Sequence, residues 1–170
     1  EWGGLYFFSQ SKNNSINYTN FINGGASTSI SGQNTIAATI QLDPDDGNSN
    51  QPKLRITNST IKNAQGYGIV AFASSMYAEN NLIVECGAEN MALLQGGNYE
   101  INDCTMANYG WDFNRRDKNG VFAATNFYAI SATEYAHSPL TLTMNNTIVY
   151  GTFNNELYID KIDESPASVT

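Results

Sequence analysis

Residues 66–88 read GYGIVAFASSMYAENNLIVECGA, and residues 89–110 read ENMALLQGGNYEINDCTMANYG. The two segments can be aligned almost without a gap. Four pairs of residues carry the alignment: Ile69 near Leu93, Ala78 on Ile101, Asn80 on Asp103, and Ile83 on Met106. A repeat of 22 to 23 residues with short apolar runs is typical of one coil of a stacked solenoid. This repeat predicts the fold, but it does not identify a function.

The same corner recurs outside these two segments. It is found at five places along the chain: Phe21-Ile22, Thr60-Ile61, Leu82-Ile83, Thr105-Met106 and Thr147-Ile148. The spacings between them are 39, 22, 23 and 42 residues, so each long interval holds one coil plus an insertion. The first insertion is predicted at residues 42–52, the polar run LDPDDGNSNQP, and the second at residues 111–120 or at residues 130–139.

An Asn or Asp stands just before each corner, as Asn20, Asn58, Asn80, Asp103 and Asn145. Asn tolerates the left-handed backbone conformation of a sharp bend, and its amide can bond to the equivalent Asn one coil away. No apolar run keeps helical spacing over a dozen residues. The residues therefore predict an all-β chain whose short strands pair in parallel through about five coils.

Composition and charge limit the classes of function. The chain of 170 residues suits a single domain over residues 1–170, and 41% of its residues are hydrophobic. Eight Lys and Arg against sixteen Asp and Glu give a net charge of −8, which disfavours nucleic acid as a partner. No apolar run is long enough to cross a bilayer, so no direct membrane insertion of this segment is expected. Cys86 and Cys104 fall at different positions of the repeat, and we expect buried thiols.

Several segments resemble a known fold family. PKLRITNSTIKNAQ at residues 52–65 and the repeat at residues 66–88 resemble the right-handed parallel β-helix repeats of the pectate-lyase-like superfamily. Three further segments resemble β-helix surface proteins of Bacteroidetes, often lipoproteins: EWGGLYFFSQSKNNSINYTNFING, GGNYEINDCTMANY and TMNNTIVYGTFNNEL. The resemblance implies a right-handed parallel β-helix that is exported to the outer membrane or cell surface. Neither end supplies a polar cap, so we expect the chain to be part of a longer solenoid.

Few residues fit the chemistry of sugar-cleaving β-helix proteins. Asp45-Asp46 and Arg116-Asp117-Lys118 match two of the four elements of the polygalacturonase pattern, and the other two are missing. The run at residues 43–48 has oxygen ligands for Ca²⁺, but it lacks EF-hand spacing, and an exposed acidic turn is the simpler interpretation. His137 has no nucleophile beside it in a known motif. We therefore expect no catalytic residue, no bound metal and no cofactor.

Aromatic residues are the best candidates for ligand contact. If Tyr6 and Phe8 form the outward-facing set of a strand, they make a platform of the kind that stacks on sugar rings. Trp111, Arg115 and Arg116 on a nearby insertion would then form its rim. The alternative is that these aromatic residues pack beneath the insertions or against a neighbouring domain or subunit.

These observations favour a non-catalytic cell-surface module, a rigid rod that binds a glycan or a protein partner in an outer-membrane assembly. The alternative is a polysaccharide lyase or glycoside hydrolase that acts on an acidic polysaccharide. In that case Asp45 or Asp46 would converge with Arg116, Lys118 or another carboxylate in one groove. A third hypothesis is a spacer whose partner contacts lie outside these 170 residues.

Overall fold

The computed structural model describes residues 2–47, 50–110 and 120–170, and no helix occurs in these ranges. The strands are β1 (Leu5–Phe7), β2 (Asn14–Asn17), β3 (Asn20–Ile22), β4 (Ala38–Leu42), β5 (Leu54–Thr57), β6 (Thr60–Lys62), β7 (Tyr67–Glu79), β8 (Leu82–Val84), β9 (Met91–Asn102), β10 (Thr105–Asn108), β11 (Phe122–Thr125), β12 (Phe127–Ala129), β13 (Tyr135–His137), β14 (Leu140–Asn145), β15 (Ile148–Gly151), β16 (Leu157–Asp160) and β17 (Ala167–Val169). The all-β prediction is confirmed. The described part of the chain holds no helix that is long and apolar enough to span a bilayer.

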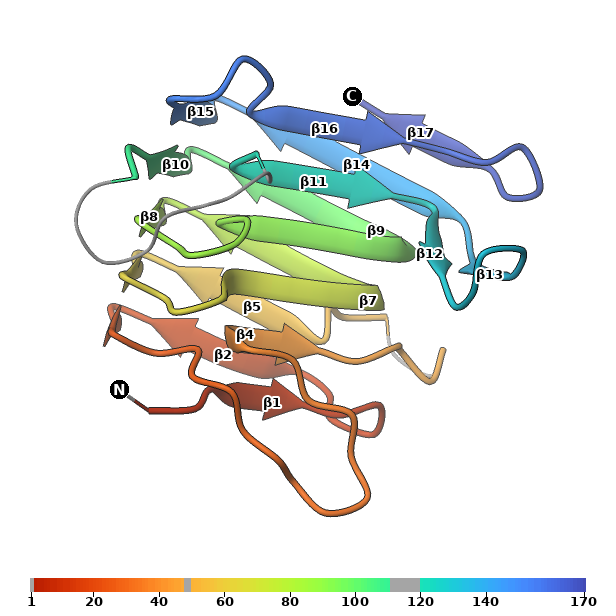
Figure 1. Cartoon of the computed structure of the whole chain (residues 1–170), viewed down its shortest axis with the longest axis horizontal. Coiled ribbons are helices and arrows are strands. Elements are labelled where there is room, and N and C mark those ends of the chain that lie inside the picture. The colour runs from red at the N-terminus through yellow and green to blue at the C-terminus, as the bar shows by residue number, and fades with distance from the viewer. Residues whose placement is uncertain (1, 48–49, 111–119) are drawn as a thin grey trace.

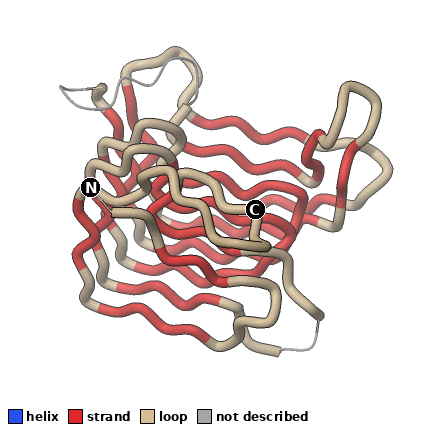
Figure 2. Tube along the Cα trace, turned by 60° about the horizontal axis from the view of Figure 1, so that its bottom comes forward, coloured by secondary structure: helices blue, strands red, loops and turns tan. Residues whose placement is uncertain are grey.

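The strands stack in three ladders of parallel pairs, and each ladder takes one strand or half-strand from successive turns of the chain (Figure 1). The first ladder runs β1-β4-β7-β9-β11-β16, and the second runs β2-β5-β7-β9-β14-β17, because the long strands β7 and β9 belong to both. The third ladder is β3-β6-β8-β10-β15. Figure 2 shows strands of successive turns side by side, with loops projecting at their ends. This arrangement is compatible with a solenoid or β-helix.

Left-handed residues mark the corner between the second and third ladders. The backbone angle φ lies between +49° and +54° at five positions one turn apart: Tyr18, Asn58, Asn80, Asp103 and Asn146. The amide of Asn80 donates a 2.8 Å hydrogen bond to Asn58 Oδ1, so the predicted bond between equivalent asparagines is present. Asn20 and Asn145, however, are the first residue of β3 and the last residue of β14, and neither is the left-handed corner residue.

The predicted corners of the first and last turns are accordingly wrong by one residue. Phe21 pairs with Ile61, and Thr105 pairs with Ile148. Asparagines stand close together near both corners, as Asn17 and Asn20 around Tyr18 and as Asn145 beside Asn146, so the amide pattern alone does not select the register. Burial selects it, because the observed register places Phe21 in the core and packs Val149 against it.

Inward-facing side chains of the three ladders form the main core. One row of it consists of Ile40, Ile69, Met91 and Phe122, which pair with one another across adjacent turns and are all 0% exposed. Ile69 therefore pairs with Met91 and not with Leu93. The predicted pair is displaced by two residues, and a β-bulge between Phe72 and Ser74, which adds one residue to β9, accounts for one of them.

A column of side chains able to form hydrogen bonds directly follows the left-handed residues at the corner between the second and third ladders. It consists of Thr19, Ser59, Asn81, Cys104 and Thr147. In four of them the side chain donates a hydrogen bond of 2.7–3.2 Å to the carbonyl oxygen two residues earlier. Cys104 therefore takes the place that Ser or Thr takes in other turns. Cys86 and Cys104 are both buried and neither is in a disulfide, as expected.

The predicted insertions are partly correct. Residues 43–47 and 50–53 leave the stack between β4 and β5, and the antiparallel hairpin β12–β13 leaves it between β11 and β14. The segment at residues 23–37, between β3 and β4, was not predicted as an insertion. The candidate at residues 111–120 lies, except for residue 120, outside the described residues.

Asn81→Ala should destabilise the fold far more than a change at its exposed neighbour. Asn81 is 4% exposed, its Nδ2 donates to Ile56 O at 2.9 Å, and its Oδ1 accepts from Ser59 N at 2.9 Å. Because both backbone groups lose their partner, we expect a loss of about 2–4 kcal/mol in urea denaturation. Asn80→Gly keeps the left-handed backbone and should cost less than about 1 kcal/mol. Equal losses in the two variants would contradict this role of Asn81.

Buried phenols predict loss of stability at alkaline pH. Burial raises the pKa of Tyr99, and burial assisted by Glu89 raises the pKa of Tyr67 to about 12. The unfolded chain loses these protons near pH 10, about two pH units earlier than the folded chain does at Tyr67. The contribution of these phenols to the free energy of unfolding is therefore fully present below about pH 10, and it is lost as the pH rises above that value. In denaturation from pH 8 to 11, Tyr99→Phe should show a shallower fall than the wild type, and an unchanged slope would contradict the assignment.

Candidate functional site

Tyr6 and Phe8 lie on the outer side of the first turn, because Phe7 between them packs against the core. Their rings are stacked, with centroids 6.2 Å apart and planes inclined by 9°. Both side chains are half-buried, and the Tyr6 hydroxyl is buried without a hydrogen-bond partner. The residues predicted as the rim of this platform lie outside the described residues: Trp111, Arg115 and Arg116. The structure thus describes the two residues of the predicted platform and none of its rim.

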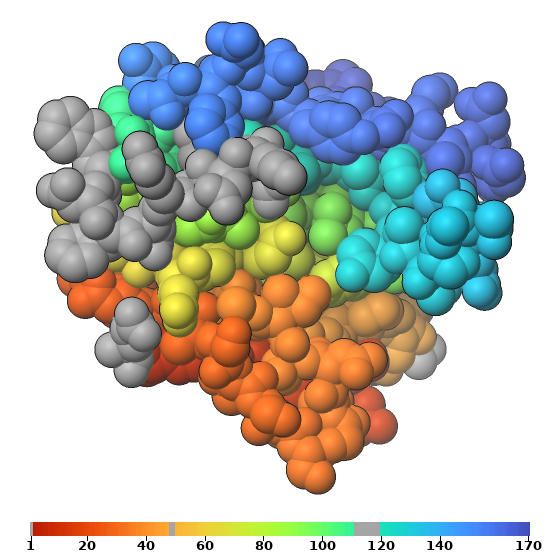
Figure 3. Space-filling model, viewed as in Figure 1, coloured from red at the N-terminus to blue at the C-terminus, as the bar shows by residue number. Residues whose placement is uncertain are grey.

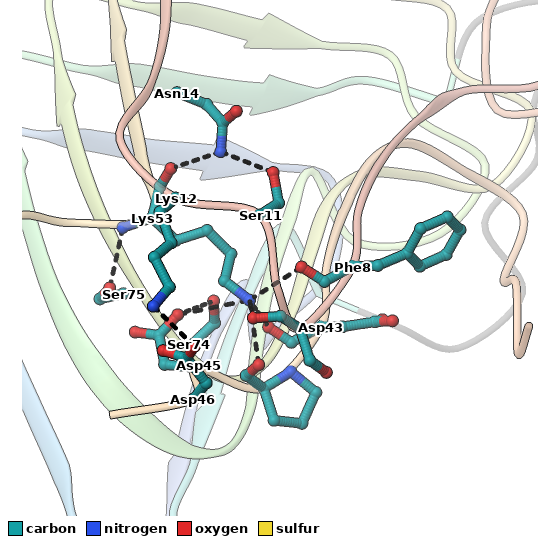
Figure 4. A network of polar contacts seen from close by, with 12 residues as sticks. Phe8, Ser11, Lys12, Asn14, Asp43, Asp45, Asp46, Lys53, Ser74 and Ser75 are labelled. Carbon is teal, nitrogen blue, oxygen red and sulfur yellow. Dashed lines mark hydrogen bonds and ion pairs between the residues drawn. The ribbon is translucent and has the colours of Figure 1, made fainter. Parts of the chain in front are cut away.

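The polar run after β4 surrounds a buried cation. The side chain of Lys53 is 2% exposed, and its ammonium group donates to the carbonyl oxygens of Asp43 at 2.7 Å and Pro44 at 2.9 Å. Asp45 Oδ1 lies 3.4 Å from Lys53 Nζ, and the carbonyl oxygens of residues 8–9 lie 3.4 and 3.5 Å from it (Figure 4). Five oxygens from two successive turns thus satisfy one buried charge.

The interpretation of residues 43–48 as an exposed acidic turn holds at Asp45, Asp46 and Gly47, which are exposed, whereas Asp43 and Pro44 are half-buried against Lys53. The loop is oxygen-rich, as a Ca²⁺ loop is, but its oxygens face an ammonium group of the chain itself. Asp46 forms an exposed ion pair with Lys12 at 2.7 Å. The ranges that the structure describes contain no group of three or more His, Cys, Asp or Glu side chains that could hold a metal ion. Lys53 therefore fixes the position of this loop, which we call the Lys53 wall because it borders a groove.

A groove of about 510 Å³ lies beside this wall, on the outer face of β5, β7 and β9. Asp45 and residues 50–52 line one side of it. Arg55, Tyr77 and Glu100 line the floor, and they are paired in register across the three strands. Because neighbouring strands lie about 4.8 Å apart, these three side chains can contact one ligand. We call this hollow the Arg55 groove.

Short contacts orient the side chains on the groove floor. The guanidinium carbon of Arg55 lies 3.8 Å from the centroid of the Tyr77 ring, in cation–π geometry. The Tyr77 hydroxyl donates to Glu79 Oε2 at 2.9 Å, and Asn102 Nδ2 donates to Glu100 Oε1 at 2.9 Å. A ligand would therefore meet polar groups whose orientation is already restricted.

Two carboxylates, those of Asp45 and Glu100, line the Arg55 groove. Asp45 is also bound within the fold, because it faces Lys53 and accepts a 3.3 Å hydrogen bond from Ser74 Oγ. The enzyme hypothesis requires Asp45 or Asp46 to meet a second acid or a cation in one groove. Asp45 and Glu100 line the same groove, whereas Arg116 and Lys118 lie outside the described residues.

Sequence reasoning missed the floor of the groove, although a signal was present. Arg55, Tyr77 and Glu100 each stand six residues before an apolar corner residue of the repeat: Ile61, Ile83 and Met106. Aligning outward-facing positions as well as inward-facing ones would have found the row. His137, by contrast, lies in β13 opposite Phe127 and does not line this groove.

No family model matches the chain, and neither a curated protein nor a solved structure gives a significant match.

Lys53→Met should destabilise the protein by about 3 kcal/mol, because it leaves a carboxylate and buried carbonyl oxygens without their cation. The matched control is Lys12→Met, which removes the same charge from an ion pair whose side chains are 36% and 32% exposed. That control should cost less than about 1 kcal/mol. Thermal and urea denaturation of both variants measure the difference. Similar small losses in the two variants would show that the five oxygens around Lys53 do not need its charge for the fold to be stable.

Proposed function

We propose that this chain is a right-handed parallel β-helix module of the cell surface that binds a glycan without cleaving it, and that the Arg55 groove is its binding site. The observation that carries the proposal is the row of Arg55, Tyr77 and Glu100 across three successive turns. An extended saccharide repeats polar groups along its length, so a row of polar side chains from stacked strands suits it.

The side chains of the groove match a hydroxyl-rich ligand. Arg55 supplies several fixed donors, Glu100 supplies acceptors, and Asn98 on the adjacent row supplies both. The groove lining contains one cation, Arg55, and two carboxylates, Asp45 and Glu100, and the whole chain has a net charge of −8. This balance repels a polyanion, so a neutral glycan is favoured over an acidic one.

The proposed location rests on the resemblance to exported β-helix proteins and on composition. Only 14% of the residues are charged, so solubility depends on neutral polar side chains. A rigid stack of this kind also suits a scaffold that presents the groove away from an outer membrane, or that engages a protein partner there.

Arg55→Ala should weaken glycan binding by about 10-fold or more, because a hydrogen bond to a charged group contributes about 1.5–3 kcal/mol. A neutral-glycan array identifies the ligand, and calorimetry then measures Kd for wild type and variant. Lys62→Ala is the matched control, because Lys62 is an exposed cation on β6 outside the groove. If no glycan binds, or if both variants bind equally, the proposal is wrong.

A glycoside hydrolase or lyase is the alternative, favoured by the meeting of Asp45 and Glu100 in one groove. Reducing-sugar and unsaturated-uronate assays across neutral and acidic polysaccharides, with Ca²⁺ and with a chelator, distinguish the two functions. Turnover that is lost in both Asp45→Asn and Glu100→Gln would replace the binding proposal. Binding without turnover supports it.

A further inference from the structure

A second hollow of about 470 Å³ lies on the outer face of the first ladder. Its walls are residues 32–34 and Ile36 of the loop before β4 and Tyr128 of the hairpin β12–β13, and its floor includes Phe72 and Gln95. We call it the Phe72 cleft. Figure 3 shows the floor of β7 and β9, in yellow and green, between the orange loop and the cyan hairpin. The loop between β4 and β5 contributes to both hollows, with Asp43 in the cleft and Asp45 in the groove.

Strained backbone forms the floor of the cleft. The β-bulge between β7 and β9 holds Ala73 at a φ of +41° and Gln95 at a φ of +66°. Left-handed conformations are costly for such residues, and strain of this kind is concentrated at binding sites. Gly96 beside Gln95 has a φ of +84°, and a Cβ there would press on the carbonyl oxygens of Ser138 and Pro139. The bulge and the hairpin thus fit closely against each other.

Buried polar contacts fix the walls. Gln41 is 2% exposed, its Nε2 donates to Asn34 O at 2.8 Å and to Asp43 Oδ1 at 2.7 Å, and its Oε1 accepts from Ile36 N at 2.8 Å. One amide therefore ties the loop before β4 to the end of that strand. On the other side, Ser138 Oγ donates to the carbonyl oxygen of Gln95. The cleft is consequently formed before any ligand arrives.

The lining combines an aromatic pair with amides. The rings of Phe72 and Tyr128 meet edge to face, with centroids 5.2 Å apart and planes inclined by 86°, and Tyr128 is 41% exposed. Gln33, Asn34 and Gln95 add carboxamide groups, and no Lys or Arg is among the described lining residues. We propose that the Phe72 cleft binds the ring of an uncharged sugar, as a site separate from the Arg55 groove.

Charge and shape select this class of ligand. The one carboxylate in the lining, that of Asp43, already accepts a hydrogen bond from Gln41, so it is not an unpaired anion that selects a cation. A phosphate or carboxylate ligand would find no cation. A pyranose offers an apolar face to an aromatic ring and hydroxyl groups to carboxamides, and the volume lies within the usual range of about 300–1,000 Å³ for ligand sites.

Backbone-amide NMR tests this proposal with four probes: the methyl glycosides of glucose, galactose, mannose and N-acetylglucosamine. At least one should give saturable shifts at Phe72, Gln95 and Tyr128, with Kd near about 1–10 mM. Tyr128→Ala should weaken that binding by about 10-fold, because an exposed ring supplies the stacking surface. Gln33→Ala, in an exposed loop, should weaken it by about 3-fold without affecting the core.

Two controls separate this site from its alternatives. Tyr150→Ala removes a 54% exposed tyrosine from β15 and should leave the shifts unchanged. Arg55→Ala should also leave them unchanged, so the cleft and the groove can fail independently. The proposal is overturned if none of the four probes gives saturable shifts, if the shifts occur only at the Arg55 groove, or if Tyr128→Ala binds as the wild type does.

Discussion

Parallel pairing between successive turns is the constraint on which the rest of the structure depends. Each inner strand takes its backbone hydrogen bonds from the turn before and the turn after, so a paired segment cannot change length without breaking bonds on both sides. Left-handed corner residues such as Asn58, Asn80 and Asp103 meet this constraint, because each changes the chain direction at an equivalent position. Extra residues are accommodated outside the ladders, at residues 23–37, at residues 43–47 and 50–53, and in the hairpin β12–β13.

The insertions bring a second requirement, because their backbone polar groups must also find partners. Lys53 satisfies the loop after β4 with one buried ammonium group, and Gln41 satisfies the loop before β4 with one buried carboxamide. Both side chains are placed by the stacked strands, since Gln41 lies in β4 and Lys53 directly precedes β5. The regular part of the molecule therefore positions its irregular loops, and these loops supply walls of both the Arg55 groove and the Phe72 cleft.

How far sequence reasoning reached depends on the part of the repeat. Between residues 74 and 106 the predicted pairs are correct, as with Ala78 on Ile101 and Ile83 on Met106. They are correct because apolar residues face inward at matching positions, which periodicity records directly. The pair of Ile69 and Leu93 is displaced by two residues, and the bulge accounts for one of them. The sequence does not reveal the bulge, because Gln95-Gly96-Gly97 resembles an ordinary turn signal. The corners at either end failed because burial, and not the position of an asparagine, selects the corner residue, which is Tyr18 in the first turn and Asn146 in the last.

The sequence by itself determined the repeat, the inward-facing apolar rows and hence the parallel stacking of strands, because these depend on spacing alone. The same spacing also predicts the row of Arg55, Tyr77 and Glu100, because these residues occupy equivalent positions on the paired strands of three successive turns. Only the tertiary structure decided that loop oxygens enclose Lys53, and that Phe72 meets Tyr128 across a cleft. These contacts join segments distant in the sequence through loops of irregular path, so no local pattern encodes them.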